Sequence, residues 1–372
     1  MGDLRMFLMR LRVLSICLSC VIVLVGLMGC KASAPTSMVI TPTATIDDSY
    51  PTCLEFITPG SDGNLWFTDA YRNTIAKISP KSGKVTEYNT PTSNSNPIYI
   101  AKGPDGNLWF TESNNNATPP VKKIGKMSPS TGEITEYSVP MSDPSQVFFG
   151  GLTTGPDGNM WFTSPYENKI GKISPMTGEI TEYNVPFANS NPRNIIALPD
   201  GNLWFTTSNE NTPTALDKIS PITGDITVFN IATADANLPG ITYITIGSDG
   251  NLWFTDPPNK IGKLSLVTGD VSEYNVPTEN SYPLCITAGP DGNLWFSESY
   301  EGKIGKISPA TDIITEYNIP NPGNYPNNAG NIGPFSITTG PDGNLWFVER
   351  VMNIICKISP KTNNITEYSI PH

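Results

Sequence analysis

The sequence contains a single histidine, His372, which is also the last of its 372 residues. Histidine is a frequent general acid or base and the commonest side-chain metal ligand, so mechanisms built on a histidine dyad, a triad or a histidine metal site are excluded. Charged residues make up only 15% of the chain, and the formal net charge is −11. This acidic balance argues against binding of nucleic acid, because phosphates need a basic surface.

The chain contains 32 glycines and 35 prolines. Both residues interrupt helices, so the composition argues against a mainly helical protein and favours many short strands joined by turns. The sequence contains no Walker loop, dinucleotide fingerprint, nucleophile elbow or HExxH motif. The common nucleotide-binding and hydrolase signatures are therefore missing as well.

One long apolar run, residues 13–29, lies near the amino terminus and follows three arginines. A basic segment, an apolar segment and a small residue before a cleavage point form the pattern of a secretory signal. The sequence Leu27-Met28-Gly29-Cys30 resembles the lipobox of bacterial lipoproteins, which implies lipid on Cys30. We predict a signal peptide over 1–29, a Ser/Thr/Pro-rich tether over 30–50, and an extracytoplasmic lipoprotein attached to the cell membrane. An uncleaved membrane anchor is the alternative.

Removal of the signal peptide and lipidation of Cys30 would leave few free cysteines in the mature chain. The mature chain would keep Cys30, Cys53, Cys285 and Cys356. With Cys30 acylated, three thiols are left, so at most one disulfide is expected. Their spacing does not indicate a metal cluster.

The dominant feature of the chain is an internal repeat. The hexapeptide Asp-Gly-Asn-(Leu or Met)-Trp-Phe occurs seven times, and its copies start at Asp62, Asp105, Asp157, Asp200, Asp249, Asp291 and Asp342. The seven tryptophans of the chain are those inside these copies. Each copy is followed by a Lys-Ile-Ser-Pro-like stretch and then by an Ile-Thr-Glu-Tyr-like stretch.

The unit from Leu284 to Pro320 illustrates the strand pattern. Short apolar or alternating segments at 286–288, 293–298, 303–308 and 313–318 are separated by turn residues. Four short antiparallel strands in a unit of 40 to 50 residues are typical of a propeller blade. The sequence therefore predicts an all-β, seven-bladed β-propeller over residues 51–372, with Trp and Phe buried between blades. Residues 38–41 also read as a strand, surplus to the seven blades.

Comparison of the seven units with one another separates two faces of this disk. The first-to-second and third-to-fourth strand turns have fixed lengths, and they share one face because the strands alternate in direction. The other two connections vary in length and share the opposite face. Binding sites are commonly carried by variable loops on a rigid frame, so we expect the variable face to be the binding face. Drift of the loop lengths without function is the alternative.

The repeated unit resembles the virginiamycin B lyase (streptogramin lyase) family, through Gly-Pro-Asp-Gly-Asn-Leu-Trp-Phe-Thr-Glu, Asn-Lys-Ile-Gly-Lys-Ile-Ser and Gly-x-Ile-Thr-Glu-Tyr. The resemblance covers about residues 51–371 and implies a seven-bladed propeller. It also implies an elimination that opens the ester-linked ring of streptogramin B antibiotics with a magnesium ion. The family's two catalytic histidines correspond to Leu284 and Phe335, and one family glutamate falls near Gly333. A further family glutamate is matched by Glu349, the one candidate catalytic residue.

Five carboxylates recur at the end of the second strand of a unit, directly after Trp-Phe-x. They are Asp69, Glu112, Asp256, Glu298 and Glu349. Because the units that carry them are contiguous in a closed ring, we expect these residues on the binding face. Asp256, Glu298 and Glu349 are the candidate ligands for a hard cation such as Mg²⁺ or Ca²⁺. The alternative is that each carboxylate caps its own loop.

Two functions follow from these observations. The first is a membrane-anchored propeller that binds a small molecule, a cyclic peptide or a protein, acts as a monomer and performs no chemistry. The second is a Mg²⁺-dependent carbon–oxygen lyase that acts on a cyclic depsipeptide, or a lactonase-like hydrolase. The lack of histidine favours the first, since general acid–base catalysis needs a titrating group at the reacting atoms.

Overall fold

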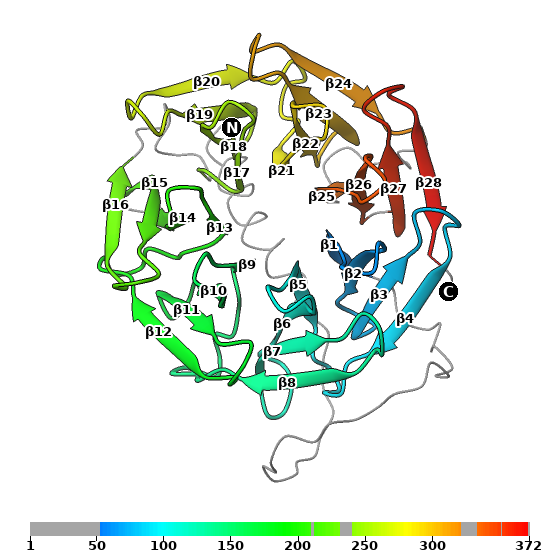
Figure 1. Cartoon of the computed structure of the whole chain (residues 1–372). Helices are drawn as coiled ribbons and strands as arrows, with labels where there is room; N and C mark the ends of the chain where they lie inside the picture. The colour runs from blue at the N-terminus through cyan, green and yellow to red at the C-terminus, as the bar shows by residue number, and fades with distance from the viewer. Residues whose placement is uncertain (1–52, 210–211, 231–239, 321–332, 351, 371–372) are drawn as a thin grey trace, which may run out of the picture.

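The computed structural model describes residues 53–209, 212–230, 240–320, 333–350 and 352–370. These residues form seven four-stranded antiparallel sheets, and Figure 1 shows them arranged as blades around a central axis. The first strand of each blade lies nearest the axis and the fourth lies at the rim. The predicted seven-bladed propeller is confirmed.

The first four blades follow one another around the ring in chain order. Blade 1 contains β1 (Leu54–Pro59), β2 (Leu65–Asp69), β3 (Thr74–Ile78) and β4 (Val85–Asn89). Blade 2 contains β5 (Pro97–Lys102), β6 (Leu108–Asn114), β7 (Val121–Met127) and β8 (Ile134–Ser138). Blade 3 contains β9 (Gly151–Thr154), β10 (Met160–Ser164), β11 (Lys169–Ile173) and β12 (Ile180–Asn184). Blade 4 contains β13 (Ile195–Ala197), β14 (Leu203–Asn209), β15 (Thr212–Ile219) and β16 (Ile226–Asn230).

The remaining three blades repeat the same order. Blade 5 contains β17 (Ile244–Ile246), β18 (Leu252–Asp256), β19 (Lys260–Leu264) and β20 (Val271–Asn275). Blade 6 contains β21 (Pro283–Ala288), β22 (Leu294–Glu298), β23 (Lys303–Ile307) and β24 (Ile314–Asn318). Blade 7 contains β25 (Pro334–Thr339), β26 (Leu345–Glu349), β27 (Ile354–Ile358) and β28 (Ile365–Ser369).

The hexapeptide builds a turn and a strand at once. Asp62 Oδ1 accepts hydrogen bonds from the Asn64 amide at 3.2 Å and from the Trp66 indole at 3.0 Å. Gly63 has a φ of 77°, a left-handed conformation that favours glycine. The aspartate that forms the turn therefore also fixes the tryptophan of the following strand.

Trp66 and Phe67 point to opposite sides of β2, because side chains alternate along a strand. Trp66 packs in a cluster with residues of blade 2, whereas Phe67 packs in a cluster with residues of blade 7. Each second strand thus supplies one aromatic side chain to each neighbouring blade. This confirms that the tryptophans and phenylalanines are packing residues of the core.

A repeated stack joins each blade to the next. In blade 1, the Lys77 ammonium lies 5.0 Å above the Trp66 ring and 3.7 Å from Asp62. Trp66 in turn stacks on Tyr88, with ring centroids 5.6 Å apart. The Tyr88 ring lies against the turn glycine Gly132 of blade 2, where a Cβ atom would approach it to 2.6 Å. The same contact recurs at Gly83, Gly178 and Gly224, so at these four junctions the tyrosine of one blade leaves no room for a side chain on the turn residue of the next. The contact is absent at Gly269 of blade 5, and blades 6 and 7 have Asp312 and Asn363 at this turn position.

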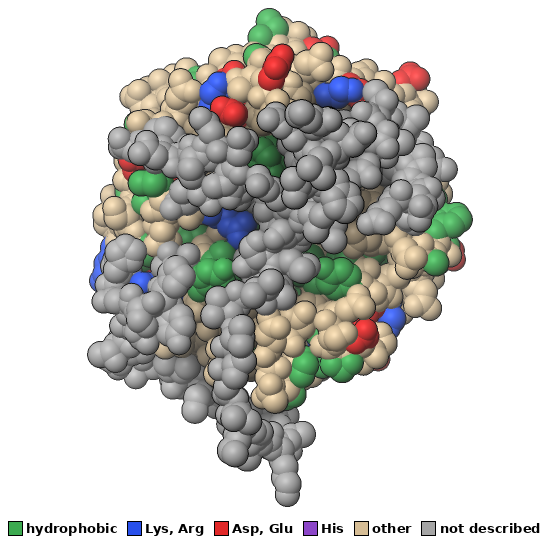
Figure 2. Space-filling model, turned by 180° about the vertical axis from the view of Figure 1, so that it is seen from behind, with side chains coloured by type: hydrophobic (Ala, Val, Ile, Leu, Met, Phe, Trp, Pro, Cys, Tyr) green, Lys and Arg blue, Asp and Glu red, His purple; other side chains and the backbone are tan. Residues whose placement is uncertain are grey.

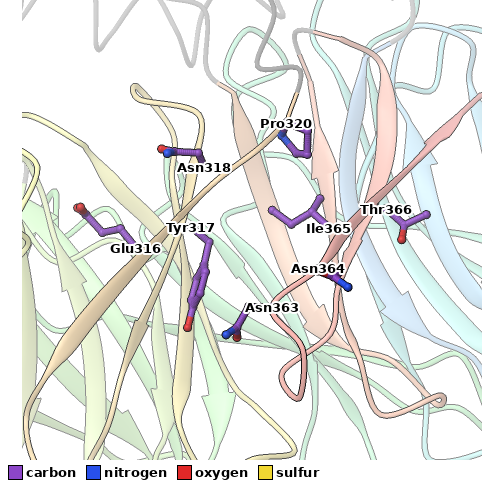
Figure 3. Close-up of a pocket in the computed structure, with 8 residues that line it drawn as sticks. All are labelled: Glu316, Tyr317, Asn318, Pro320, Asn363, Asn364, Ile365 and Thr366. Atoms are coloured by element: carbon purple, nitrogen blue, oxygen red, sulfur yellow. The ribbon is translucent and has the colours of Figure 1, made fainter.

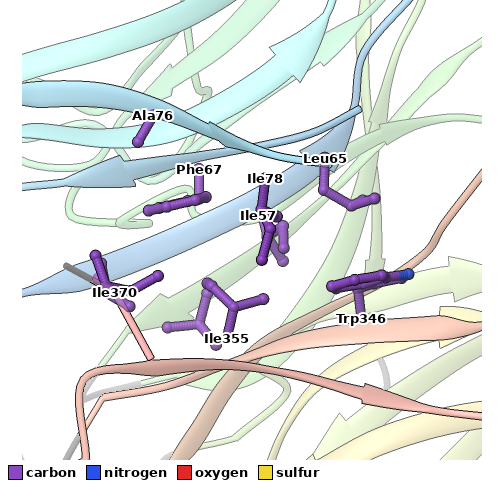
Figure 4. Close-up of a cluster of buried hydrophobic side chains, with 10 residues drawn as sticks. Ile57, Leu65, Phe67, Ala76, Ile78, Trp346, Ile355 and Ile370 are labelled. Atoms are coloured by element: carbon purple, nitrogen blue, oxygen red, sulfur yellow. The ribbon is translucent and has the colours of Figure 1, made fainter. Parts of the chain in front are cut away.

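The ring closes between blades 7 and 1, where the two ends of the propeller meet. Leu54, Ile57 and Phe67 of blade 1 pack with Trp346, Ile355 and other side chains of blade 7 in a fully buried cluster (Figure 4). Tyr368 lies against Gly83, as Tyr88 lies against Gly132. Closure thus uses the same contacts as the other blade junctions, and among the described residues the first and last sheets each keep their own four strands.

We call the side of the disk with the two fixed turns the constant face, and the opposite side the variable face. Figure 2 views the molecule from the side opposite to Figure 1. On the variable face, the hairpin β6–β7 extends to Asn114 and Val121. The predicted strand at residues 38–41 and the tether lie outside the described residues. Within the described part of the chain there is no helix long and apolar enough to cross a membrane, and Cys53, Cys285 and Cys356 are buried and not joined in a disulfide.

The turn aspartates should contribute strongly to stability. Asp157 accepts hydrogen bonds from the Asn159 amide, the Asn159 side chain and the Trp161 indole. Asp157→Ala leaves the buried indole N–H without its acceptor, so we expect a loss of about 2–3 kcal/mol in the free energy of unfolding. Urea denaturation measures the loss. Glu279→Ala, at an exposed position, is the matched control and should stay within about 0.5 kcal/mol of wild type; equal losses in the two variants would contradict the role of the turn.

Candidate functional site

The five predicted carboxylates are buried at the ends of the second strands. Their exposed fractions are 1% for Asp69, 0% for Glu112, 5% for Asp256, 0% for Glu298 and 0% for Glu349. Each lies two residues after the phenylalanine of its strand, so it shares the side that faces the preceding blade. The structure therefore places them in the seams between blades, one strand back from the axis. It does not bring Asp256, Glu298 and Glu349 together, because they belong to three different seams.

A second carboxylate from the fourth strand enters the same seam. In blade 6, the register pairs Phe296 with Gly305 and Gly305 with Glu316. A Cβ atom at Gly305 would lie 2.8 Å from Glu298 Oε1 and closer still to the Phe296 ring, so the missing side chain leaves room for both of these residues. Desolvation, followed by the neighbouring Glu316 carboxylate, raises the pKa of Glu298 to about 8. Glu298 is therefore the member of the pair that holds a proton near neutral pH.

Glu316 is the ionised member of this pair. It accepts hydrogen bonds from the amide and the hydroxyl of Thr278, both at 2.9 Å, and lies 3.6 Å from the Lys303 ammonium. Desolvation raises the pKa of Glu316, but the bonds from Thr278 outweigh it and leave the pKa below its ordinary value. Blade 2 repeats the arrangement with Glu112, Glu136, Thr92 and Lys123. The pair thus fastens the loop that enters a blade to the outer strand of that blade.

Blade 4 keeps the carboxylate but moves it. Val228 occupies the position of the fourth-strand glutamate, and Asp217 occupies the position of the third-strand glycine. Asp217 is 2% exposed, and burial raises its pKa to about 6. The Thr207 hydroxyl donates a hydrogen bond to it at 3.4 Å. The comparison of the repeat units did not identify Asp217. A signal was present, because the other units have glycine or another small residue at this third-strand position.

The mouth of the axis on the variable face is formed where the first strands begin. In each first strand, one residue pairs with the phenylalanine of the second strand, and the residue two positions earlier lies at the mouth. The ring of these seven equivalent residues comprises Glu55, Ile98, Gly150, Arg193, Thr242, Leu284 and Phe335. The two positions that the family resemblance assigns to histidine therefore belong to this ring. Leu284 is buried, with 8% of its surface exposed.

Hydroxyl groups of the preceding blades hold these two positions. Thr255 donates a hydrogen bond to the Leu284 carbonyl at 2.7 Å, and Ser297 donates one to the Phe335 carbonyl at 2.8 Å. The same hydroxyls accept the amides of Tyr243 and Cys285 in their own blades. The backbone at both family positions is fixed, so the side chains present there define the local chemistry.

Phe335 lies beneath an ion pair that the sequence analysis did not identify. The Arg350 guanidinium is 4.5 Å from the centre of the Phe335 ring and 2.6 Å from Glu55 Oε1. It also contacts the Cys53 sulfur at 3.3 Å. Glu55 and Arg350 are 295 residues apart in the chain. No local sequence pattern could therefore indicate that they pair.

Aromatic side chains fill the space near the axis one residue further along the first strands. The Phe56 ring lies 4.3 Å from Tyr99, 6.1 Å from Tyr243 and 5.3 Å from Phe335. These residues come from blades 1, 2, 5 and 7, so they meet across the axis. The mouth therefore has an apolar floor and a charged pair on the side of blades 7 and 1.

The residues of the mouth do not fit the magnesium ion that the resemblance implies. Among the four family positions, Leu284, Phe335 and Gly333 offer no side-chain oxygen, and Glu349 alone offers a carboxylate. Mg²⁺ requires several oxygen ligands, and the adjacent Arg350 guanidinium already supplies a positive charge. The described residues contain no group of three or more His, Cys, Asp or Glu side chains placed to hold a metal ion.

A shallow groove lies on the outer surface between blades 6 and 7 (Figure 3). Asn363 stands there at the turn position where Gly83, Gly132, Gly178 and Gly224 receive the tyrosine of the preceding blade. Its lining residues are Glu316, Tyr317, Asn318, Pro320, Asn363, Asn364, Ile365 and Thr366. The groove is a local variation of the blade junction and gathers no catalytic groups.

Comparison with known proteins agrees with the architecture. Residues 57–243 match the family model of the virginiamycin B lyase family. The crystal structure of virginiamycin B lyase from Staphylococcus aureus is 34% identical over 85% of this chain and 96% of that chain, with a TM-score of 0.68. A streptogramin B lyase structure is 35% identical over 82% and 93% of the two chains, with a TM-score of 0.66.

A third similar structure is a catalytically inactive variant of the Staphylococcus aureus lyase with quinupristin, in which one histidine is replaced by alanine. It is 32% identical over 91% of this chain and 99% of that chain, with a TM-score of 0.68. A search of curated proteins gave no match.

The seam carboxylates predict how stability depends on pH. The folded-state pKa is raised to about 8 for Glu298 and about 6 for Asp256 and Asp217, so their contribution is complete below their unfolded pKa and is lost as the pH rises through these values. Conversely, Asp105, whose pKa is lowered to about 2, loses its contribution as the pH falls towards that value. We expect the free energy of unfolding to be highest near pH 4–5 and to fall by pH 8.

Glu298→Gln tests the main contributor. Glutamine mimics the protonated carboxyl, so the variant should match wild type near pH 4 and exceed it by pH 8, by on the order of 4–5 kcal/mol at most. Urea denaturation between pH 4 and pH 9 gives both curves, and the exposed Glu279→Gln is the control. A wild-type stability that is flat or rising between pH 5 and pH 8 would refute the assignment.

Proposed function

This chain belongs to the virginiamycin B lyase family, and from that premise we propose that it is a membrane-anchored, extracytoplasmic binding propeller without the lyase activity. The observation that carries the proposal is the pair Leu284 and Phe335 at the two catalytic histidine positions. Neither side chain can accept or donate a proton, and general acid–base catalysis requires a titrating group within hydrogen-bond reach of the reacting atoms.

The surroundings of Phe335 support the same conclusion. Arg350 stacks on its ring and pairs with Glu55. Among the family's four functional positions, Glu349 alone keeps its chemistry, and it is fully buried. One buried carboxylate cannot complete an elimination by itself, because one group must remove a proton while others stabilise the leaving oxygen.

We place the ligand at the mouth of the axis on the variable face. The support is twofold: loop lengths vary on this face, and the family positions belong to the ring that forms the mouth. The predicted carboxylates Asp69, Glu112, Asp256, Glu298 and Glu349 end their strands on the same face but lie buried in the seams. The apolar floor of Phe56, Tyr99 and Tyr243 favours a ligand with an apolar or aromatic surface. A small molecule, a cyclic peptide or a protein loop all have this chemistry. The cation site at Asp256, Glu298 and Glu349 stays a prediction from the sequence.

The second candidate function is the lyase itself, with Glu349 as the base. It is favoured by the identity of 32–35% to streptogramin lyases along nearly the whole propeller. Detection of a linear product distinguishes the two candidate functions, because the lyase opens the ring of its substrate and the binding protein does not.

Incubation with quinupristin and Mg²⁺ provides that measurement. We expect no linear product by mass spectrometry, while virginiamycin B lyase from Staphylococcus aureus linearises the same sample as a positive control. Binding of intact quinupristin, followed by calorimetry, should be weakened in a Phe335→Ala variant if the mouth is the binding site. Turnover by the wild-type chain that disappears in Glu349→Gln would show that the lyase is the correct function.

The location is proposed from the sequence of the amino terminus. Residues 1–29 have the pattern of a signal peptide, Cys30 completes a lipobox-like sequence, and residues 30–50 form the tether. A lipid on Cys30 would hold the propeller at the outer side of the cytoplasmic membrane.

Substitution of Cys30 tests this assignment. Cys30→Ala removes the acylated thiol, so the protein should appear as an uncut precursor or in the soluble fraction, whereas wild type is found in the membrane fraction. Cys53→Ala, at a buried position in blade 1, is the control for loss of a thiol. Unchanged membrane attachment and unchanged size of Cys30→Ala would disprove lipidation.

A further inference from the structure

The constant face carries an ordered set of exposed side chains that the packing of the propeller does not use. They occupy the third position of the Ser-Pro-x-Thr-Gly-like turn between the third and fourth strands. From blade 1 to blade 7 these residues are Lys81, Ser130, Met176, Ile222, Val267, Ala310 and Lys361. Three apolar residues thus occupy consecutive blades 3 to 5. They are flanked by the small residues Ser130 and Ala310, and the two lysines stand in blades 7 and 1.

The three apolar residues are almost completely exposed. Met176 is 95% exposed, Ile222 91% and Val267 93%. The turns that carry them are held internally: in blade 3 the Ser174 hydroxyl accepts the Thr177 amide at 3.3 Å, and the Gly178 amide donates to the Ser174 carbonyl at 2.8 Å. Scattered exposed apolar residues are ordinary, but here they stand at one equivalent position of three adjacent blades on fixed turns.

Charges on this face are arranged in the same way. Each apolar residue is followed, three positions later, by an exposed acid, namely Glu179, Asp225 and Asp270. The turns of blades 7 and 1 instead expose Lys361, Lys81 and Lys84. Within these third-to-fourth strand turns, one arc is therefore apolar with three acids, and the other carries three lysines. The hexapeptide aspartates on the same face lie beside lysines of their own blades, as Asp62 lies beside Lys77 and Asp157 beside Lys172.

The two arcs lie across the ring from each other. In a ring of seven blades, the side opposite blade 4 is the junction of blades 7 and 1. Figure 1 shows β13–β16 on one side of the axis and β25–β28 with β1–β4 on the other. A two-fold axis in the plane of the face would place the apolar and acidic arc of one copy over the basic arc of a second copy, and both contacts would form at once.

We propose that the constant face joins two copies of this chain in a face-to-face dimer. Lysine side chains can cover the apolar tips with their methylene stems while their ammonium groups reach the neighbouring carboxylates. Such an isologous two-fold contact is the commonest symmetry of soluble oligomers. The dimer departs from the monomer expected from the sequence, because exposure of the apolar tips was not visible there. It leaves both variable faces accessible to ligand.

A lipid surface fits the same tips less well. Glu179, Asp225 and Asp270 would then face the head groups, which in an anionic membrane repel them. The described chain also enters the propeller at Cys53, at the start of the first strand and therefore on the variable face. A membrane tether would thus leave from the side of the disk away from these tips.

Light scattering of the full chain, purified from membranes in detergent, measures the number of chains in each particle. We expect two chains per particle at low ionic strength and dissociation as salt is added. Ile222→Glu should weaken association at least tenfold, while Phe187→Glu, an equally drastic change at an exposed residue on the variable face, should leave it intact. The melting temperature of each variant verifies that the propeller is folded.

Charge reversal tests the predicted pairing. Glu179→Lys, Asp225→Lys and Asp270→Lys together should abolish the dimer, and addition of Lys81→Glu, Lys84→Glu and Lys361→Glu should restore it. In intact membranes, a variant with both Ile222→Cys and Lys361→Cys should cross-link between chains, whereas Ile222→Cys alone should not.

Three results would overturn the proposal. The first is one chain per particle for wild type at a protein concentration of about 100 µM in low salt, because a specific dimer should have a dissociation constant below roughly this value. The second is association that is indifferent to the charge reversals. The third is a monomer that binds phosphatidylglycerol–phosphatidylethanolamine vesicles and loses that binding with Ile222→Glu, which would assign the tips to a membrane surface.

Discussion

The stack of an aspartate, a tryptophan, a lysine and a fourth-strand aromatic ring, which every blade repeats, is the constraint on which the ring depends. The aspartate of the hexapeptide fixes the tryptophan, the lysine lies over the tryptophan and tyrosine rings, and at four junctions the tyrosine lies against the turn glycine of the next blade. The chain must therefore keep both turns of the constant face at one length. The loops of the opposite face take no part in this contact, so their lengths can differ from blade to blade.

The same geometry explains the buried carboxylates. A third-strand glycine allows the second-strand phenylalanine to lie flat on the sheet, and in blade 6 it also leaves room for Glu298 beside Glu316. Two carboxylates in one seam are stable if one keeps its proton and the other is held by a threonine and a lysine. Blade 4 moves its carboxylate to Asp217 and has Val228 where other blades have glutamate. This exchange indicates that the seam requires a polar group, whichever strand supplies it.

Much of the fold could be predicted from the sequence because its determinants are local and occur seven times. The hexapeptide encodes a turn, a strand and two packing residues within six positions, and internal comparison fixed the number of blades. The candidate site was less accessible. Alternation of side chains places Glu298 on the same side of β22 as Phe296, but its position beside Glu316 depends on a strand register that the sequence does not reveal. The Arg350–Glu55 pair joins the last blade to the first, so no local pattern could have indicated it.

The Arg350–Glu55 pair also connects the mouth of the axis to the closure of the ring. Blades 7 and 1 are held by side-chain packing and by hydrogen bonds such as that from the Ile57 amide to the Ser336 hydroxyl, since each described sheet keeps its own four strands. Arg350 and Phe335 come from blade 7, and Glu55 and Cys53 come from blade 1. In this chain, the position of Phe335, which the family resemblance assigns to histidine, thus contributes an aromatic ring to the junction where the two ends meet. A histidine at this position would remove the phenyl ring on which Arg350 stacks, so the absence of a titrating group here and the packing of the last seam both depend on Phe335.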